Sequence, residues 1–363
     1  MSKIEFVGMV FPRQWSETQG GARQPGFDLD YLRFHARAHE QAGFDRVLIA
    51  SGPGSPDSLH IAAYLAQHTE RLGFMVAHRP GLVAPTLAAR SFATLDHLSG
   101  GGRLRLHAIT GITAEPQEGD TITDKSARYA RAAEYLQIVR RTWTSEEPFT
   151  FEGKYFTVRD ALSPIKPVRP GSVEISFGGA SDAAYDVGVR HADLYAIWGE
   201  PLADAKQQIT RIRDAAAAAG VAAPRISLSV RLILGATEDQ AWARAHDILA
   251  KIQQNPNFHP GGPRHGKQKA VASERLLAAA ARGDRHDRAL WMPTATAVGA
   301  YGDTTALVGT PETVAEALLD YVDLGVTTFL NRGYDPLYDT VDYGRWVIPA
   351  VRAEAARRAL AAA

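Results

Sequence analysis

Short runs of β-branched and aliphatic residues alternate with longer helical patterns along almost the whole chain. Eight of these runs have the composition of buried strands, at residues 4–10, 46–50, 73–78, 103–109, 173–177, 194–197, 226–234 and 327–330. The stretches between them carry apolar residues at the 3.6-residue spacing of amphipathic helices. This alternation predicts a parallel sheet built from βα units, because parallel strands need a crossover connection between them.

Eight strands with a matching set of helices favour a closed (β/α)8 TIM barrel of the α/β class, with a doubly wound open sheet as the alternative. We expect residues 1–363 to form a single barrel domain. In such barrels the functional residues lie at the C-terminal ends of the strands, so insertions at that face are of interest.

Three segments interrupt the barrel pattern. Residues 15–27 follow the first strand and predict a loop over the barrel mouth, and residues 149–158 alternate around a Glu-Gly turn as in a β-hairpin. Residues 253–305 form the longest insert, which follows the seventh strand–helix unit and opens with a Pro- and Gly-rich run at 255–267. Long irregular inserts are usually lids or disordered, so we predict a mobile lid with hinges at residues 261–262 and 299–302.

Composition excludes several classes of function. Lys plus Arg and Asp plus Glu both number 40, so no overall charge would recruit nucleic acid or an anionic membrane surface. The chain has no cysteine, which removes disulfides, a thiol nucleophile and thiolate metal ligands. No leader-like segment or run of about 18 apolar residues is present, so we expect a soluble cytoplasmic protein. Metal-binding and nucleotide-binding signatures are absent, and we expect no metal.

The turn after the fifth predicted strand has the composition of a phosphate-binding site. Gly178 and Gly179 let the backbone approach a ligand closely, and Ser181 and Asp182 stand at the start of an Ala-rich helix. The N–H groups and the positive dipole end of such a helix attract anions. The simpler alternative is an ordinary strand-to-helix turn with an N-cap residue.

The residues predicted at the strand ends are polar, cationic and aromatic. They are Ser51, His78, Arg79, His107, Thr110, Gly179, Ala180, Ser181, Trp198, Arg231, Arg332 and Tyr334. This excess of cations over carboxylates predicts an anionic ligand. Each residue also has a structural interpretation. His78 and His107 could be hydrogen-bonded core histidines, Arg231 could serve an ion pair, Trp198 could pack at the rim, and Tyr334 could be a core tyrosine bonded to backbone.

Several ordered blocks make the chain resemble a known family. They are VAHRPG at 76–81, ATLDHLSGG at 93–101, FEGK at 151–154, FGGASDAA at 177–184, WGEP at 198–201 and TALVG at 305–309. With these blocks the chain resembles the bacterial luciferase-like flavin-dependent monooxygenases. Within that family it is most similar to the FMNH2-dependent alkanesulfonate monooxygenases.

The resemblance implies a two-component reaction. A separate NAD(P)H-dependent FMN reductase supplies FMNH2, and reduced FMN with O2 converts an organosulfonate to sulfite and an aldehyde. It also implies a homodimer or homotetramer.

The family blocks implicate particular residues. Ala180, Ser181 and Tyr129 would contact the FMN phosphate, with His107 and Thr110 along the flavin ring. We add Gly179 and Ser51 as cofactor-binding candidates from their places at the strand ends. The substrate would meet the catalytic candidates Arg231, Trp198, Tyr334, Arg332, His78 and Arg79.

The sequence departs from the alkanesulfonate pattern at four places. Ser55 replaces a cysteine, Ile233 replaces a histidine, residues 299–302 lack an arginine, and Arg332 replaces a small residue. We therefore predict that Arg332 takes over an anion contact, and that the substrate is bulkier or more polar, such as the sulfosugar sulfoquinovose.

Three alternatives remain open from the sequence. One is hydride transfer with the deazaflavin F420 by a relative of the same superfamily. A second is an FMNH2 monooxygenase acting on another substrate, such as a sulfone or thioether. A third is a flavin-binding protein without catalysis, which the many cations at the mouth disfavour.

Overall fold

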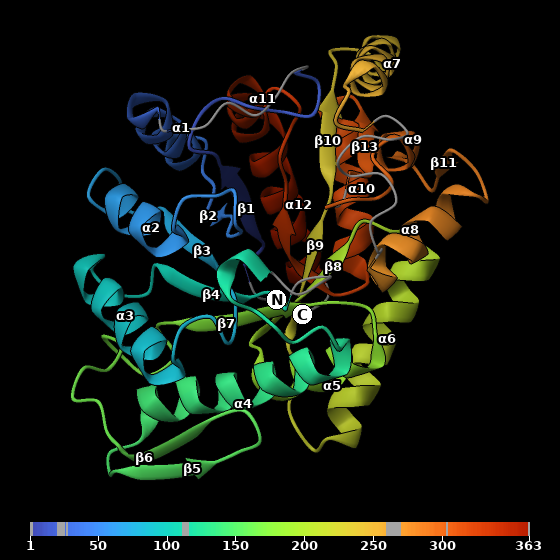
Figure 1. The fold of residues 1–363 in the computed structure, drawn as a ribbon. Coiled ribbons are helices and arrows are strands. Elements are labelled where there is room, and N and C mark those ends of the chain that lie inside the picture. The colour runs from blue at the N-terminus through green and yellow to red at the C-terminus, as the bar shows by residue number, and fades with distance from the viewer. Residues whose placement is uncertain are drawn as a thin grey trace. The chain divides into compact units, whose positions relative to one another are not determined.

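The computed structural model describes residues 3–19, 26, 28–110, 116–258, 270–302 and 304–361. Eight parallel strands close into a barrel in the order β1-β14-β9-β8-β7-β4-β3-β2 (Figure 1). These strands are β1 (Glu5–Val10), β2 (Arg46–Ile49), β3 (Gly73–His78), β4 (Leu104–Ala108), β7 (Glu174–Gly178), β8 (Leu194–Trp198), β9 (Arg225–Ser229) and β14 (Val326–Leu330). The predicted TIM barrel is confirmed.

The chain divides into two compact units. The first unit comprises Met1–Asp45, Ala196–Arg211 and Arg225–Ala363, and the second comprises Arg46–Tyr195 and Ile212–Pro224. The expectation that residues 1–363 behave as a single domain stays a prediction.

The second unit contains four consecutive βα elements of the barrel. Its helices are α2 (Ser58–Ala66), α3 (Pro85–Leu98), α4 (Lys125–Thr144) and α5 (Asp182–His191). Every residue of β3 is buried, as expected of a parallel strand covered on both faces. Side-chain caps begin three of the helices, because Asp57, Asp124 and Ser181 each accept a backbone N–H from the first turn.

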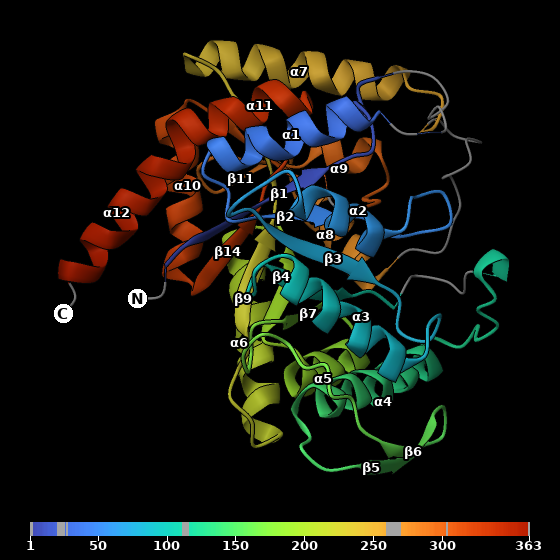
Figure 2. The same cartoon turned by 90° about the vertical axis from the view of Figure 1, so that its left-hand side faces the viewer.

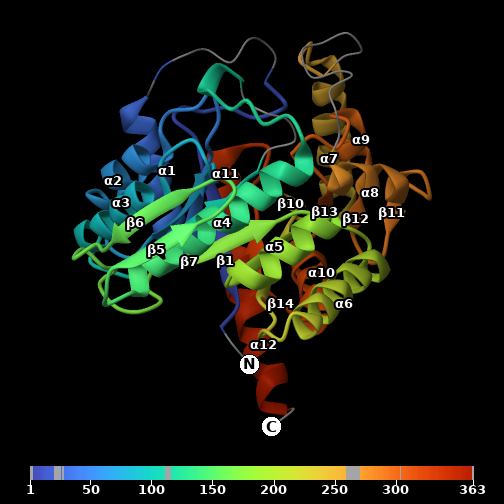
Figure 3. The ribbon, with the colours of Figure 1, turned by 60° about the horizontal axis from the view of Figure 1, so that its bottom comes forward.

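The predicted β-hairpin is also confirmed in the second unit. It consists of β5 (Phe149–Glu152) and β6 (Thr157–Ala161), which pair antiparallel beside α4 (Figure 3). The Glu134 carboxylate on α4 accepts the backbone N–H groups of Lys154, Tyr155 and Phe156 at 2.8, 2.8 and 3.1 Å. One carboxylate thus fixes the hairpin turn to the barrel helix.

The first unit adds a second sheet and most of the remaining helices. The sheet has the order β10 (Arg231–Leu234), β13 (Ala306–Gly309), β12 (Leu290–Trp291) and β11 (Arg285–His286). The helices are α1 (Leu29–Gln41), α7 (Glu238–Gln254), α8 (Val271–Ala280), α9 (Pro293–Ala297), α10 (Pro311–Asp323), α11 (Pro336–Asp342) and α12 (Ile348–Ala361), with a π-helical turn at Tyr343–Val347. Helix α6 (Leu202–Ala218) begins in this unit.

The prediction of one continuous strand at residues 226–234 is wrong, because the chain changes hydrogen-bond partner at Val230. The Val230 N–H donates to the Leu330 carbonyl at the end of β14, whereas the Arg231 N–H donates to the Thr305 carbonyl beside β13. The Asn331 side-chain amide donates to the Val230 carbonyl at 2.9 Å and closes the break. Arg231 therefore lies in the second sheet and not in the barrel.

The prediction of an irregular insert at 253–305 is wrong for residues 270–302, which hold α8, β11, β12 and α9. Arg275 on α8 donates to both carboxylate oxygens of the buried Glu200 at 2.8 and 2.6 Å, and the Ser273 hydroxyl donates to the Ala300 carbonyl. Trp291 and Val298 of this segment are buried in an apolar core that they share with residues of α7, β10 and β13. The hinge predicted at residues 261–262 lies outside the described residues.

The longest helix among the described residues, α4, has 20 residues, and five of them are Lys or Arg. Within the described ranges, no helix combines the length and the hydropathy needed to cross a bilayer.

Two buried histidines join α1 to α11, which lie side by side in Figure 2. A ring nitrogen of His35, Nε2, lies 3.0 Å from the Pro336 carbonyl, and Nδ1 of His39 lies 2.8 Å from the His35 carbonyl. The two rings pack with their centroids 4.5 Å apart. Burial lowers the pKa of His35 to about 4 and lowers the pKa of His39 well below its usual value, so both are neutral near pH 7.

The unfolded chain takes up protons at these histidines below about pH 6.5, whereas the folded chain resists until about pH 4. We therefore expect stability to be complete above pH 6.5 and to fall as the pH drops, with His35 alone accounting for about 2 kcal/mol by pH 5. Urea unfolding of wild type and His35→Gln at pH 7.5 and pH 5 measures this. Glutamine is chosen because its side-chain amide can also donate to the Pro336 carbonyl. Parallel pH dependences of the two proteins would contradict the assignment.

Candidate functional site

The turn after β7 brings together the predicted phosphate-binding residues of the second unit. Ser181 is the N-cap of α5, and its hydroxyl accepts the Ala184 N–H at 3.3 Å. Gly179 has φ +149°, a conformation that L side chains rarely adopt. The Tyr195 hydroxyl donates to the Gly179 carbonyl at 2.9 Å and fixes the turn from the next strand.

The turn has room for glycine at position 179 but not for a residue with a side chain. A Cβ atom added to Gly179 would lie 2.6 Å from the Cβ of Ala184 and 3.3 Å from the hydroxyl of Tyr129. Tyr129 comes from α4, is buried, and packs against Phe177 of β7. The hydroxyl of Tyr129, the hydroxyl of Ser181 and the first N–H groups of α5 thus border one small turn, which suits a phosphate group.

His107 lies on β4, two residues beyond a partly buried ion pair between β4 and β7. Arg105 and Glu174 pair directly across these strands, and two residues further on the His107 Nδ1 lies 2.9 Å from the Ser176 hydroxyl. Burial, and then the Arg105 charge, lower the pKa of His107 to about 4. His107 is therefore a neutral imidazole at physiological pH, held by Ser176. Thr110 lies just beyond the end of β4 and is partly buried.

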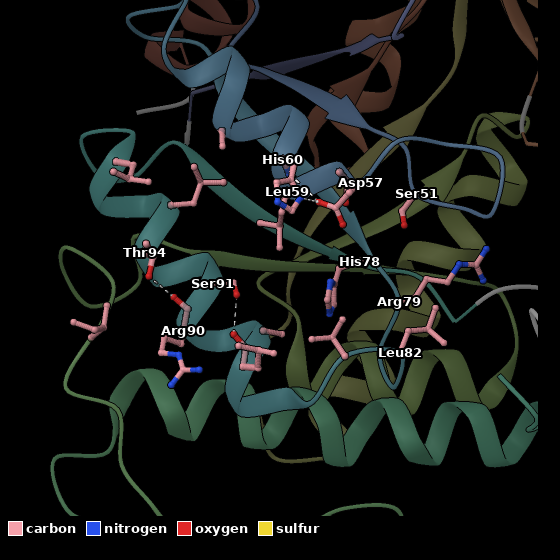
Figure 4. Close-up of a pocket in the computed structure, with 18 of the residues that line it drawn as sticks. Ser51, Asp57, Leu59, His60, His78, Arg79, Leu82, Arg90, Ser91 and Thr94 are labelled. Atoms are coloured by element: carbon pink, nitrogen blue, oxygen red, sulfur yellow. Dashed lines mark hydrogen bonds and ion pairs between the residues drawn. The ribbon is translucent and has the colours of Figure 1, made fainter. Parts of the chain in front are cut away.

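Three other predicted residues line a pocket of about 700 Å³ in the second unit: Ser51, His78 and Arg79 (Figure 4). The pocket extends between α2 and α3, where Leu59 and Thr94 lie among its lining residues. The side chains of His78 and Arg79 leave the end of β3 in different directions.

His78 is tied into the core beside this pocket. Its Nε2 lies 2.7 Å from the hydroxyl of the buried Tyr135, and its ring packs edge-on against Phe92. Burial lowers the pKa of His78 to about 4. These contacts agree with the structural interpretation of this histidine.

In the first unit, three of the predicted residues lie close to a carboxylate that was not predicted, that of Glu17. The Nη2 atoms of Arg231 and Arg332 both donate to Oε1 of Glu17, each at 2.7 Å. The side chains of Glu17 and Arg231 are 4% and 2% exposed, and that of Arg332 is 14% exposed. Arg231 also lies over the ring of Tyr334, 5.1 Å from its centroid. We call Glu17, Arg231, Arg332 and Tyr334 the arginine cluster.

The ionisation of the arginine cluster follows from this geometry. Burial alone would raise the pKa of Glu17, but the two guanidinium groups outweigh it and lower this pKa to about 2. Burial and then Arg231 lower the pKa of Arg332 to about 10, which leaves it charged at neutral pH. Burial raises the pKa of Tyr334 to about 12. At pH 7 the cluster therefore holds two positive charges and one negative charge.

Tyr334 has the backbone bond that its structural interpretation required. Its hydroxyl donates to the Thr304 carbonyl at 3.2 Å, and its ring belongs to the apolar core between α7 and the second sheet. Trp198 ends β8 as predicted and is half-buried. The other catalytic candidates His78 and Arg79 belong to the second unit.

Sequence reasoning missed Glu17, Ser176 and Asn331. Ser176 could have been found from strand periodicity, because it occupies the same face of its strand as Glu174 and pairs with His107 in the register. No local signal marks Glu17, which lies 214 residues from Arg231 and 315 from Arg332 in the sequence. Among the described residues, no three His, Asp or Glu side chains are placed to hold a metal ion.

Comparison with known proteins identifies the family. The family model described as luciferase-like monooxygenase matches residues 4–328. The chain belongs to the luciferase-like monooxygenase family. The expected assignment to the flavin-dependent monooxygenases is thereby confirmed at the level of the family.

Solved structures share the fold of this luciferase-like chain at low identity. Riboflavin lyase RcaE, crystallised with modified FMN and riboflavin, is 21% identical with a TM-score of 0.77, covering 98% of this chain and 92% of its own. The EDTA monooxygenase EmoA from Chelativorans sp. BNC1 is 18% identical with a TM-score of 0.76, covering 98% and 95%. An F420-dependent secondary alcohol dehydrogenase is 18% identical with a TM-score of 0.68, covering 96% and 99%.

We predict that Gly179→Ala destabilises the protein by about 1–3 kcal/mol, because the substitution combines an unfavourable φ with a clash against Ala184. Gly171→Ala is the matched control, since Gly171 also has a positive φ, of +76°, but faces open space. Urea unfolding of both variants measures the difference. Equal destabilisation would show that the turn has room for a side chain.

Proposed function

We propose that this enzyme is the oxygenase component of a two-component system that cleaves the C–S bond of an organosulfonate. A separate NAD(P)H-dependent FMN reductase supplies the reduced FMN, and O2 is the second substrate. The observation that carries the proposal is the arginine cluster, in which the buried guanidinium of Arg231 and the partly buried guanidinium of Arg332 converge on a single carboxylate oxygen.

The arginine cluster suits a sulfonate for geometric reasons. A guanidinium group presents several N–H donors in a fixed plane, and this fork matches anions that carry two or three equivalent oxygens. A sulfonate is such an anion and keeps its charge at physiological pH. Arg231 and Arg332 would bind and orient it, with the Tyr334 ring under Arg231 and the indole N–H of Trp198 as a further donor.

The second unit contains residues that fit the phosphate of FMN. Gly179 leaves room for it, and Ser181, Ala180 and Tyr129 border the turn at the α5 N-terminus. Neutral His107, held by Ser176, and Thr110 would lie along the flavin ring, with Ser51 as a further cofactor contact. When bound, reduced FMN supplies the electrons that activate O2.

The overall reaction balances for a sulfonate that carries hydrogen on the carbon next to sulfur. One oxygen atom of O2 ends in the aldehyde and the other in water, while the C–S bond breaks and sulfite leaves. The two electrons would come from reduced FMN, which would leave as FMN. In this scheme the residues of the chain bind the anion, place its carbon and exclude water, because water diverts such oxidations to hydrogen peroxide.

Arg332 supports a substrate other than a simple alkanesulfonate. Its guanidinium donates to the same Glu17 oxygen as that of Arg231, and this supports the proposal that Arg332 takes over the anion contact of the arginine that residues 299–302 lack. A bulkier, more polar sulfonate such as a sulfosugar like sulfoquinovose is the class we favour.

We also infer that the enzyme is a homodimer or homotetramer. Light scattering tests this, and a monomer would contradict it.

We expect the enzyme, with an FMN reductase, FMN and NADH in air, to release sulfite from at least one member of a panel of alkyl, aryl and sugar sulfonates. Arg231→Ala should lose more than about 100-fold in kcat/KM, because a buried charge-assisted pair is removed from the substrate. Arg288→Ala is the matched control, since it removes an arginine paired with Asp320 at the surface.

Two results would contradict the function. Hydride transfer to or from F420 without oxygen uptake would place the enzyme with the F420-dependent relatives. Oxygenation of a sulfone or thioether without sulfite release would keep the monooxygenase but replace the substrate.

A further inference from the structure

Glu17 occupies the point at which the two arginines converge. Its Oε1 accepts from Nη2 of Arg231 and from Nη2 of Arg332, each at 2.7 Å. Nη1 of Arg231 donates elsewhere, to the Gly333 carbonyl at 3.3 Å. The carboxylate of the chain itself therefore takes the position in which a ligand oxygen would accept from both arginines at once.

This arrangement leaves hydrogen bonds unmade. Within the described part of the chain, Oε2 of Glu17 and Nη1 of Arg332 are both buried and have no hydrogen-bond partner. Burying a charged atom without a hydrogen-bond partner lowers the free energy of unfolding, and native proteins rarely keep such an atom without a functional reason. The Glu17 carboxylate thus satisfies the two arginines incompletely and is itself incompletely satisfied.

The backbone beneath Glu17 is fixed independently of its carboxylate. The side-chain amide of Asn255, at the end of α7, donates to the carbonyls of Glu17 and Gln19, each at 3.0 Å. Asn255 is buried, so these bonds hold the segment at the end of α7 whatever the Glu17 side chain does. A change of side-chain rotamer is then enough to move the carboxylate away from the arginines.

We propose that Glu17 is an internal competitor for the substrate's anionic group, which binds the arginine cluster by replacing the Glu17 carboxylate. This rests on the proposed function, in which that group is a sulfonate. The exchange is favourable on hydrogen bonds, because a three-oxygen anion can accept from Nη2 of both arginines and also from Nη1 of Arg332. Glu17, once released, has both oxygens available to water or to a donor on the substrate.

Competition with Glu17 lowers the affinity of the arginine cluster for every anion. Every anion that enters must displace the same carboxylate, so weakening Glu17 should raise the affinity for different anions by the same factor. Repulsion by the Glu17 charge, without displacement of its carboxylate, predicts a different result. If the anion instead bound beside an unmoved Glu17, a carboxylate of the same charge but shorter reach would repel it as strongly as glutamate does.

Glu17→Asp is therefore the decisive variant. Aspartate keeps the charge but is one methylene shorter, so it cannot bridge both arginines from the same backbone. We expect Glu17→Asp and Glu17→Gln each to bind ethanesulfonate and propionate about tenfold more tightly than wild type, by isothermal titration calorimetry of the full chain. The matched control is Glu200→Asp, which shortens the buried partner of Arg275 and should leave both affinities unchanged.

Unchanged or weaker anion binding by Glu17→Asp would overturn the proposal, even in an enzyme that releases sulfite. A gain shown equally by Glu200→Asp would also overturn it, because the effect would then belong to any buried ion pair. If Glu17→Gln does not fold, the aspartate variant decides alone. Failure of the proposed function is seen separately, as tighter anion binding by the Glu17 variants in an enzyme that releases no sulfite from any sulfonate.

Discussion

The candidate substrate site depends on a change of hydrogen-bond partner in the middle of one predicted strand. Up to Val230 the chain pairs with β14 in the barrel, and from Arg231 onward it pairs with β13 in the second sheet. Asn331 closes the break by donating to the Val230 carbonyl, and it is itself fixed by an N–H bond to Val7 of β1. A strand that continued straight would leave Arg231 in the barrel wall, away from Tyr334 and Glu17.

The regular parts of the fold were predictable because their signals are local. Strand and helix periods, the Ser181 cap and the glycines of the turn after β7 are written in a few consecutive residues, and the structure places them where they were expected. The break at Val230 was not predictable in this way. Residues 226–234 read as one β-rich run, and only the end of β14 at Leu330, about a hundred residues later, removes the partner.

The charge analysis was incomplete for the same reason, because it did not count Glu17. The strand ends showed more cations than carboxylates, and this excess predicted an anionic ligand. In the folded chain Glu17, which comes from the segment after β1, neutralises part of that charge. The arginine cluster thus carries one net positive charge instead of two. A monoanion such as a sulfonate still suits it, but only in competition with an anion that the protein supplies.

A structure of the enzyme with a bound sulfonate tests most directly whether the arginine cluster is the substrate site. Crystals soaked with ethanesulfonate should show sulfonate oxygens within hydrogen-bond distance of Arg231 and Arg332, with the Glu17 carboxylate turned away from both. A sulfonate bound elsewhere, with Glu17 still held between the two arginines, would contradict the account.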